Sequence, residues 1–188
     1  MSTRDIVLIA LFAAFIAVLG AFPPLTIPAI GVPITAQSMG IMLAGGILGA
    51  KRGTLAVLLL VVVVLAGLPL LSGGRGGLAV LAGPTVGFFL GWLPAAFVTG
   101  WLTERYWAKL GFVSAFAFAV IGGVLVLYAC GIPGIALVAG IPLAKAAIGS
   151  AAFIPGDLIK AGVAAAVIIM VKRSYPLIAS GRAASIGR

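Results

Sequence analysis

Charged residues are so sparse in this chain that they divide it into long apolar segments. Residues 6–50, 53–74, 76–103 and 110–144 contain no Asp, Glu, Lys or Arg. A helix that crosses a bilayer needs about 20 predominantly apolar residues. Several of these segments are long enough for one crossing, and the first is long enough for two. The pattern therefore predicts membrane-spanning helices rather than the core of a soluble domain.

Segments rich in glycine, proline or charge indicate where these helices end. The proline-rich segment 23–33 splits the first apolar stretch, "KRG" at 51–53 ends the second helix, and 67–77 is a glycine-rich loop. The charged segment 103–111 is a turn, and 130–142 breaks the following helix. The predicted helices cover residues 4–22, 34–50, 53–68, 83–103, 111–130 and 156–173, with a short amphipathic segment at 142–152.

Composition supports an all-α integral membrane protein. The chain is 63% hydrophobic and 8% charged, whereas soluble domains have about 25% charged residues. We expect one six-helix transmembrane domain at 1–175, followed by a polar, disordered tail at 176–188. An even number of helices places both termini on one side. With Arg4 inside, nine of the twelve basic residues lie inside, so both termini are predicted to be cytoplasmic.

Only four charged residues remain on the outer side in this topology: Arg75, Lys145, Asp157 and Lys160. Charges within a membrane are costly and by default indicate a functional site. Irregular backbone at that depth persists only where it is buried in protein or lines a wet cavity. The three outward segments of this kind, 23–33, 67–83 and 130–156, are therefore expected to form the walls of an outward-facing pocket. A surface role is favoured for Lys145.

Asp157 and Lys160 lie three residues apart in "FIPGDLIKAG" (153–162), and share one face of the last helix. Pro155 and Gly156 fix where that helix begins, which places Asp157 near its positive end. One interpretation is a helix cap whose charge Lys160 neutralises. The other is a ligand clamp, in which the carboxylate accepts N–H groups and the ammonium donates to a carbonyl. A cyclic urea or amide would suit that pair.

Further candidates lie in two loops. Arg75 is surrounded by glycines in "SGGRGG", where the backbone can approach a ligand closely. Its guanidinium could bind a ligand carboxylate or, alternatively, a lipid phosphate. Thr35, Gln37 and Ser72 could each bond a ligand or a neighbouring helix. If all these groups share one pocket, the ligand has an anionic end and a polar uncharged end.

The first helix contains small residues at a spacing of four. Ala10 and Ala14 form one such pair, and Ala13 and Ala17 form another. Small side chains at this spacing let two helices approach closely. The pattern predicts packing either against another chain or within this one.

Together these residues resemble the BioY family, the biotin-binding S components of energy-coupling-factor (ECF) vitamin transporters. The resemblance covers about residues 5–173 and is carried by "VPITAQSMGIMLAGGILG", "GLPLLSGGRGGLAVLAGPTVGFFLGW" and "FIPGDLIKAG" in that order. It implies the S-component fold, with the vitamin near the outer face and its ureido ring held by Asp157 and Lys160. It also implies that the 67–85 loop holds the valerate end, with Arg75 as candidate. Family members have an asparagine near this loop, where this chain has Ser72 and glycines.

The resemblance also implies partners. Ala10 and Ala14 are similar to the S-component surface that meets a transmembrane coupling subunit. The chain has no P-loop motif, so ATP would be hydrolysed by partner ATPases. No cofactor or bound metal is expected, nor any nucleic acid, because no basic cluster has interleaved aromatic residues. The expected location is the cytoplasmic membrane.

We therefore expect a substrate-capture subunit for biotin uptake. One alternative retains the transporter class but changes the cargo to another vitamin or a small carboxylic acid. A second is a structural membrane subunit. An intramembrane enzyme is disfavoured, because the chain has no histidine, one cysteine and three acidic residues from which to build a catalytic site.

Overall fold

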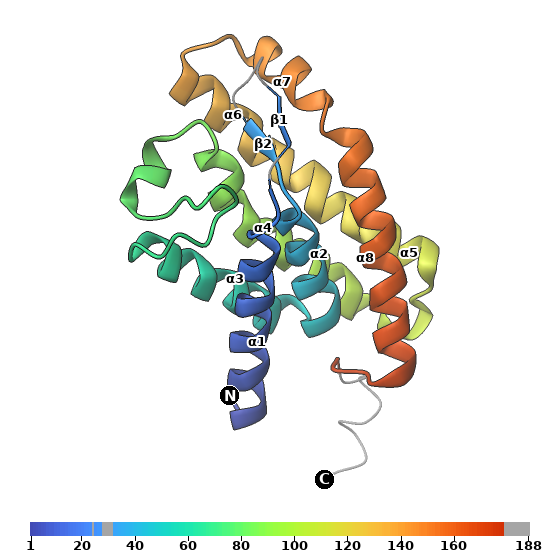
Figure 1. The fold of residues 1–188 in the computed structure, drawn as a ribbon. Helices are drawn as coiled ribbons and strands as arrows, with labels where there is room; N and C mark the ends of the chain where they lie inside the picture. The colour runs from blue at the N-terminus through green and yellow to red at the C-terminus, as the bar shows by residue number, and fades with distance from the viewer. Residues whose placement is uncertain (24, 28–31, 179–188) are drawn as a thin grey trace.

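The computed structural model describes residues 1–23, 25–27 and 32–178 and consists almost entirely of helices (Figure 1), which confirms the all-α prediction. The α-helices are α1 (Thr3–Leu19), α2 (Gln37–Leu48), α3 (Ala50–Leu65), α4 (Val86–Arg105), α5 (Phe112–Val120), α6 (Leu127–Ala139), α7 (Leu143–Ala151) and α8 (Ile154–Ser174). Short 3₁₀ turns cover Leu78–Ala82 and Trp107–Lys109, and a π-helical turn, Ile121–Val126, joins α5 to α6.

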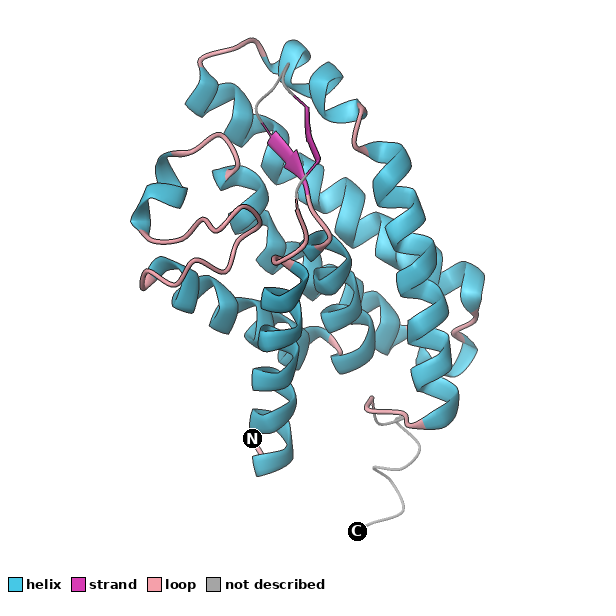
Figure 2. Ribbon diagram, in the orientation of Figure 1, coloured by secondary structure: helices cyan, strands magenta, loops and turns pink. Residues whose placement is uncertain are grey.

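A short antiparallel pair of strands lies between α1 and α2. Strands β1 (Leu25–Ile27) and β2 (Val32–Ile34) pair with Thr26 opposite Pro33. Figure 2 shows them near α7, toward the end of the molecule away from the N-terminus. The sequence predicted irregular backbone here, and its described parts are instead extended and paired.

Helix α2 is the buried centre of the fold. Every residue of α2 except Met39 is buried, and α2 packs against α1, α3, α4 and α8. Glycines allow the close approach to α4, because a Cβ on Gly45 would lie 3.0 Å from the backbone nitrogen of Gly100. Small residues at such crossings let helix backbones pack tightly.

Within the part of the chain that the structure describes, three helical segments are long and apolar enough to cross a membrane. They are α4, α8 and the continuous helix Phe112–Ala139 that comprises α5, the π turn and α6. The other long helices are shorter, with 17 residues in α1, 16 in α3 and 12 in α2. These lengths agree with a multi-pass membrane protein, and the predicted number of six crossings stays a prediction.

The predicted break at 130–142 is wrong over most of its length. The helix continues through Gly131, Pro133 and Gly134 to Ala139. The two glycines lie against α4, where a Cβ on Gly134 would come within 2.6 Å of the Gly87 Cα. Glycine and proline are tolerated inside membrane helices when neighbouring helices pack around them. The glycines of this segment therefore allow close packing of two helices and do not form a loop.

The predicted end of the second helix at 51–53 is also wrong. Gly49, with a φ of 85°, separates α2 from α3, and only glycine adopts that conformation without strain. Lys51 and Arg52 therefore belong to the first turn of α3.

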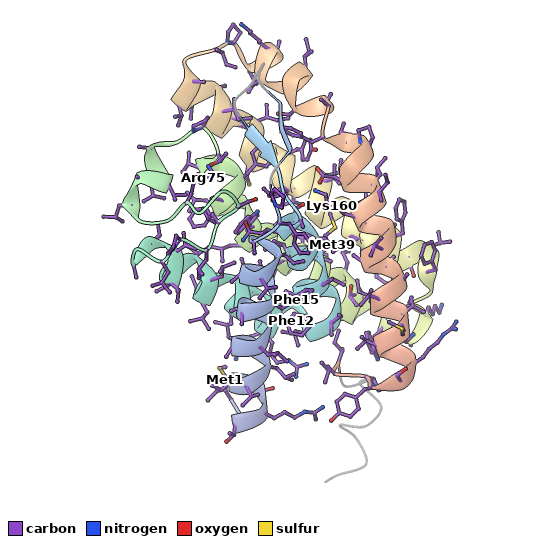
Figure 3. All side chains as sticks on the ribbon, viewed as in Figure 1. Met1, Phe12, Phe15, Met39, Arg75 and Lys160 are labelled. Atoms are coloured by element: carbon purple, nitrogen blue, oxygen red, sulfur yellow. The ribbon has the colours of Figure 1, made fainter. Side chains whose placement is uncertain are left out.

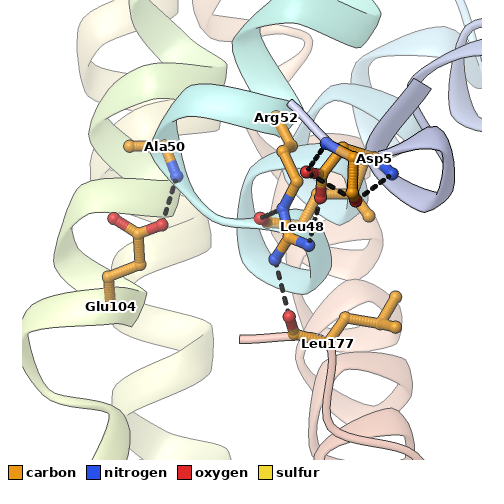
Figure 4. Close-up of polar contacts among 7 residues, drawn as sticks. Asp5, Leu48, Ala50, Arg52, Glu104 and Leu177 are labelled. Atoms are coloured by element: carbon orange, nitrogen blue, oxygen red, sulfur yellow. Dashed lines mark hydrogen bonds and ion pairs between the residues drawn. The ribbon is translucent and has the colours of Figure 1, made fainter. Parts of the chain in front are cut away.

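Arg52 connects three parts of the molecule at this end (Figure 4). Its guanidinium pairs with Asp5 at 3.2 Å and donates to the carbonyl oxygens of Leu48 at 3.0 Å and Leu177 at 2.6 Å. The start of α1 and the end of α8 thus lie at the same end of the fold (Figure 1), as the predicted topology requires. Ile178 is buried in the core, so the folded chain extends past the predicted boundary at 175. Residues 179–188 of the predicted tail lie outside the described part.

Candidate ligand-binding site

A pocket with about 620 Å³ of empty space, part of it open to solvent, lies between the start of α2, the loop after α3, α4, α6 and the start of α8. Its walls are Thr35, Gln37, Ser38, Leu71, Arg75, Thr85, Phe88, Phe89, Trp92, Leu127, Phe153, Asp157 and Lys160. The pocket thus brings together five of the six residues that the sequence singled out for ligand binding. Of the three predicted wall segments, 67–83 contributes Leu71 and Arg75, and 130–156 contributes Phe153.

Asp157 and Lys160 form a close ion pair at the start of α8. The Lys160 ammonium lies 2.7 Å from Asp157 Oδ1, and the Asp157 side chain is 7% exposed. Pro155 in the first turn of α8 fixes where the helix begins. Asp157 also accepts hydrogen bonds from the Tyr128 hydroxyl at 2.6 Å and from the Ser38 hydroxyl at 3.5 Å. The pair therefore belongs to a buried polar network, which exceeds what a helix cap requires.

Lys160 links α8 to the start of α2. Besides Asp157, its ammonium donates to the Thr35 carbonyl oxygen at 2.8 Å and to the Ser38 hydroxyl at 2.9 Å. A lysine ammonium has three N–H donors, and these three contacts use all of them. A ligand carbonyl that binds Lys160 must therefore replace one of these acceptors.

Arg75 reaches the pocket from the loop after α3, whereas Lys160 comes from α8 (Figure 3). Its guanidinium donates to the Ser72 carbonyl at 3.2 Å and to the Thr85 hydroxyl at 3.3 Å. No carboxylate of the described residues lies within salt-bridge distance of Arg75. Burial lowers the pKa of the Arg75 guanidinium, because removal from water disfavours the charged form. An anionic group in the pocket would offset that cost.

Aromatic and aliphatic side chains form the space between the polar groups. Phe88, Phe89 and Trp92 come from α4, and Leu127 comes from α6. The Phe89 and Trp92 rings meet edge to face with centroids 5.5 Å apart, a preferred aromatic arrangement. An apolar pocket with a few fixed polar groups is typical of small-molecule sites.

The side chains of two predicted ligand-binding residues, Gln37 and Ser72, form hydrogen bonds with other parts of the protein. The Gln37 amide donates to the carbonyls of Ile16 at 3.3 Å and Leu70 at 3.1 Å, and its oxygen accepts from the Ser72 backbone N–H at 3.1 Å. Ser72 is buried, is not among the described residues that line the pocket, and donates its hydroxyl to the Phe22 carbonyl at 2.9 Å. The structure thus places Gln37 and Ser72 as braces for the 67–77 loop.

Sequence reasoning did not single out Ser38 and Tyr128 as members of the site. Ser38 lies three residues after Thr35, in the first turn of α2. That spacing is a signal that the sequence contains. Tyr128 lies within an apolar helix, and only the fold reveals that its hydroxyl meets Asp157, 29 positions away.

Ala10 and Ala14 lie on the exposed side of α1, among exposed Val7, Leu11 and Val18. Ala13, in contrast, is buried within the chain. Both members of the first alanine pair are thus exposed, whereas in the second pair Ala13 is buried and Ala17 is half-buried. Lys145 is exposed on α7, in agreement with the surface role expected for it.

Comparison with known proteins gives a consistent result. The model of the BioY family matches residues 1–177. A biotin transporter BioY from Rhizobium etli is 56% identical and aligns over 95% of this chain and 98% of that relative. One from Rhodobacter capsulatus is 50% identical, with 84% of this chain and 87% of the relative covered.

The fold is similar to a crystal structure of the S-component for biotin from an ECF-type ABC transporter. The TM-score is 0.89 at 32% sequence identity, over 94% of this chain and 97% of that one. The predicted S-component fold is thereby confirmed. Sequence and structure agree over nearly the whole length, and this chain belongs to the BioY family.

Proposed function

We propose that this chain binds biotin and is the substrate-specific subunit of an ECF-type transporter rather than an enzyme. The observation that carries the proposal is the Asp157–Lys160 pair at one side of an apolar pocket that also contains Arg75. Biotin has a cyclic urea at one end, a carboxylate at the other and an apolar body between them. The relatives named as biotin transporters and the structure of a biotin S-component support this cargo.

In the proposed complex, each end of biotin meets a different group. A urea N–H donates to the Asp157 carboxylate, and the urea carbonyl accepts from the Lys160 ammonium. Lys160 gives up one of its contacts with Thr35 or Ser38 in exchange. The carboxylate binds the Arg75 guanidinium beside Thr85, and the aromatic side chains of α4 cover the apolar body.

Uptake requires partners in this proposal. The chain delivers biotin across the cytoplasmic membrane together with a transmembrane coupling subunit and ABC-type ATPases, which supply the energy. The exposed face of α1 that carries Ala10 and Ala14 is the proposed contact with the coupling subunit.

The test is calorimetric titration of the detergent-solubilised protein with biotin, for the parent and for Asp157→Asn, Lys160→Ala and Lys145→Ala. We expect the parent to bind and the first two variants to bind at least about tenfold more weakly, because each loses a charge-assisted hydrogen bond. Lys145→Ala is the matched control, since it removes an exposed lysine outside the pocket. If the parent protein does not bind biotin but binds another vitamin or a small carboxylic acid, that molecule takes the place of biotin as the proposed cargo. Equal binding by all four proteins would exclude the clamp.

A further inference from the structure

The two oxygens of the Asp157 carboxylate are held by different partners. Oδ1 accepts from Lys160 at 2.7 Å and lies 3.5 Å from the Ser38 hydroxyl, whose single proton is shared with the Thr35 carbonyl at 3.3 Å. Oδ2 accepts from the Tyr128 hydroxyl at 2.6 Å, the shortest hydrogen bond of the site. An ionised carboxylate has about four acceptor positions. Donors of the described residues face three of them, and on Oδ2 one position has no donor among these residues.

The Tyr128 ring is itself held in place. It is 8% exposed and meets the Phe88 ring edge to face, with centroids 5.6 Å apart and an interplanar angle of 83°. Tyr128 is not among the described residues that line the pocket, although Leu127 and Phe88 on either side of it are. Tyr128 thus touches Asp157 and not the ligand space.

The position of Tyr128 along α6 follows from the π turn Ile121–Val126 directly before it. A π turn carries one residue more than the α-helical spacing, so it rotates the following residues by about 100° relative to a continuous α-helix. Gly122 and Gly123 accommodate this turn against α4 and α2, where a Cβ on Gly122 would lie 2.6 Å from the Ala95 carbonyl oxygen. The wide turn brings Tyr128 to Asp157.

We infer that Tyr128 is a positioning residue that fixes the orientation of the Asp157 carboxylate and thereby selects a ligand with an N–H donor. Without the phenol, no described side chain holds Oδ2, and the carboxylate is free to rotate about its Cβ–Cγ bond. With the phenol in place, Oδ2 stays apart from Lys160 and keeps one acceptor position. The phenol has a single proton, which it donates to Asp157, so a ligand group at this oxygen must bring its own proton.

This inference rests on the proposed function, since the N–H donor is the urea of biotin. The experiment is a double-mutant cycle of Tyr128→Phe and Asp157→Asn, with biotin affinity measured by calorimetry. Tyr128→Phe keeps the ring and its contact with Phe88, and thermal unfolding verifies that the variant is folded. Tyr106→Phe, which removes an exposed hydroxyl after the last residue of α4, is the matched control.

We expect Tyr128→Phe to weaken biotin binding about tenfold, as for a hydrogen bond to a charged group, and Tyr106→Phe to leave it unchanged. In the Asp157→Asn background, Tyr128→Phe should lower the biotin affinity less than about twofold, because the carboxylate that Tyr128 positions is gone. Equal losses of affinity in both backgrounds would mean that the Tyr128 hydroxyl acts independently of the Asp157 carboxylate and would overturn the inference.

A second measurement uses only the parent protein. Biotin methylated on its urea nitrogens lacks the donor that the fixed oxygen requires, and we expect it to bind at least about tenfold more weakly than biotin. Equal affinity for the two ligands would overturn the role of Asp157 Oδ2. A parent that binds neither ligand would overturn the proposed function and this inference together. Binding of biotin without coupling in the cycle would overturn the inference alone.

Discussion

Among single residues, the polar side chains around the pocket are of two kinds. The side chains of Gln37 and Ser72 form hydrogen bonds with backbone groups of α1, of the segment after it and of the 67–77 loop. Asp157 keeps an unused acceptor position, and Arg75 faces the pocket without a carboxylate partner among the described residues. A buried amide that lost its partners would cost about 1–3 kcal/mol. The first kind therefore shapes the pocket, and the second kind is the one that we propose binds the ligand.

Arg75 is predicted to recognise the charged end of the ligand. Arg75→Gln should weaken the binding of biotin about tenfold, because a charge-assisted contact is lost. The same change should leave the affinity for biotinamide, in which the carboxylate is an uncharged amide, within about twofold of the parent. Calorimetric titration of both proteins with both ligands measures the difference. An equal loss for the two ligands would show instead that Arg75 acts through its hydrogen bonds to Ser72 and Thr85.

The charged residues of the site could be predicted from the sequence, but their hydrogen-bond partners could not. Asp157, Lys160 and Arg75 stand out because charges in apolar surroundings are costly. Tyr128 carries no such signal, since a tyrosine in an apolar helix is compatible with many surroundings. Gln37 and Ser72 were predicted as ligand contacts from polarity alone. The sequence does not show which backbone carbonyls accept a hydrogen bond from a polar side chain.

At the scale of elements, glycine determines how closely α4 and α6 pack and thus how the pocket walls meet. Gly87 on α4 faces Gly131 and Gly134 on α6. Phe88 and Leu127, which line the pocket, lie on these same two helices. Sequence reasoning interpreted the glycines and Pro133 as a break, because local signals do not reveal a neighbouring helix. The predicted helices 83–103 and 156–173 were placed within three residues of the observed bounds of α4 and α8, although α4 also contains glycines and Pro94.

Gly134→Ala is predicted to destabilise this crossing. Its Cβ would lie 2.6 Å from the Gly87 Cα and 2.7 Å from the Gly87 nitrogen, and backbone cannot yield as a flexible side chain can. Overpacking of this kind costs about 1–3 kcal/mol. The unfolding midpoint in detergent should therefore fall, and biotin affinity should fall with it as α4 and α6 separate.

The matched control for that substitution is Gly162→Ala on α8. A Cβ at Gly162 meets no atom within 4 Å, and alanine favours the helix by about 0.5–1 kcal/mol over glycine. The unfolding midpoint of Gly162→Ala should be unchanged or slightly raised. An equal decrease for both variants would mean that helix packing at Gly134 is not the cause.

For the molecule as a whole, charge is distributed between two ends. The end with the start of α1 and the end of α8 holds Arg52 with Asp5, and Lys172, which donates to the Leu110 carbonyl at 3.0 Å and lies 5.4 Å from the Trp107 ring centroid. The other end holds the β1–β2 pair and α7 (Figure 1). Basic residues favour the cytoplasmic side of membrane proteins. The fold thus gives the pocket an expected direction, with its polar groups toward the outer half.

This orientation leads to a prediction about accessibility. Cys130 is the single cysteine of the chain, so Cys130→Ala provides a background for new single cysteines. Thr3→Cys, Ser174→Cys and Lys145→Cys place thiols at exposed positions near the start of α1, at the end of α8 and on α7. A membrane-impermeant maleimide added to intact spheroplasts should label only the third, and permeabilisation should expose the first two. Labelling of the Thr3 and Ser174 positions from opposite sides would require an odd number of crossings and would exclude the six-helix topology. Labelling of all three from outside would leave the basic end facing outward, against the charge distribution on which the orientation rests.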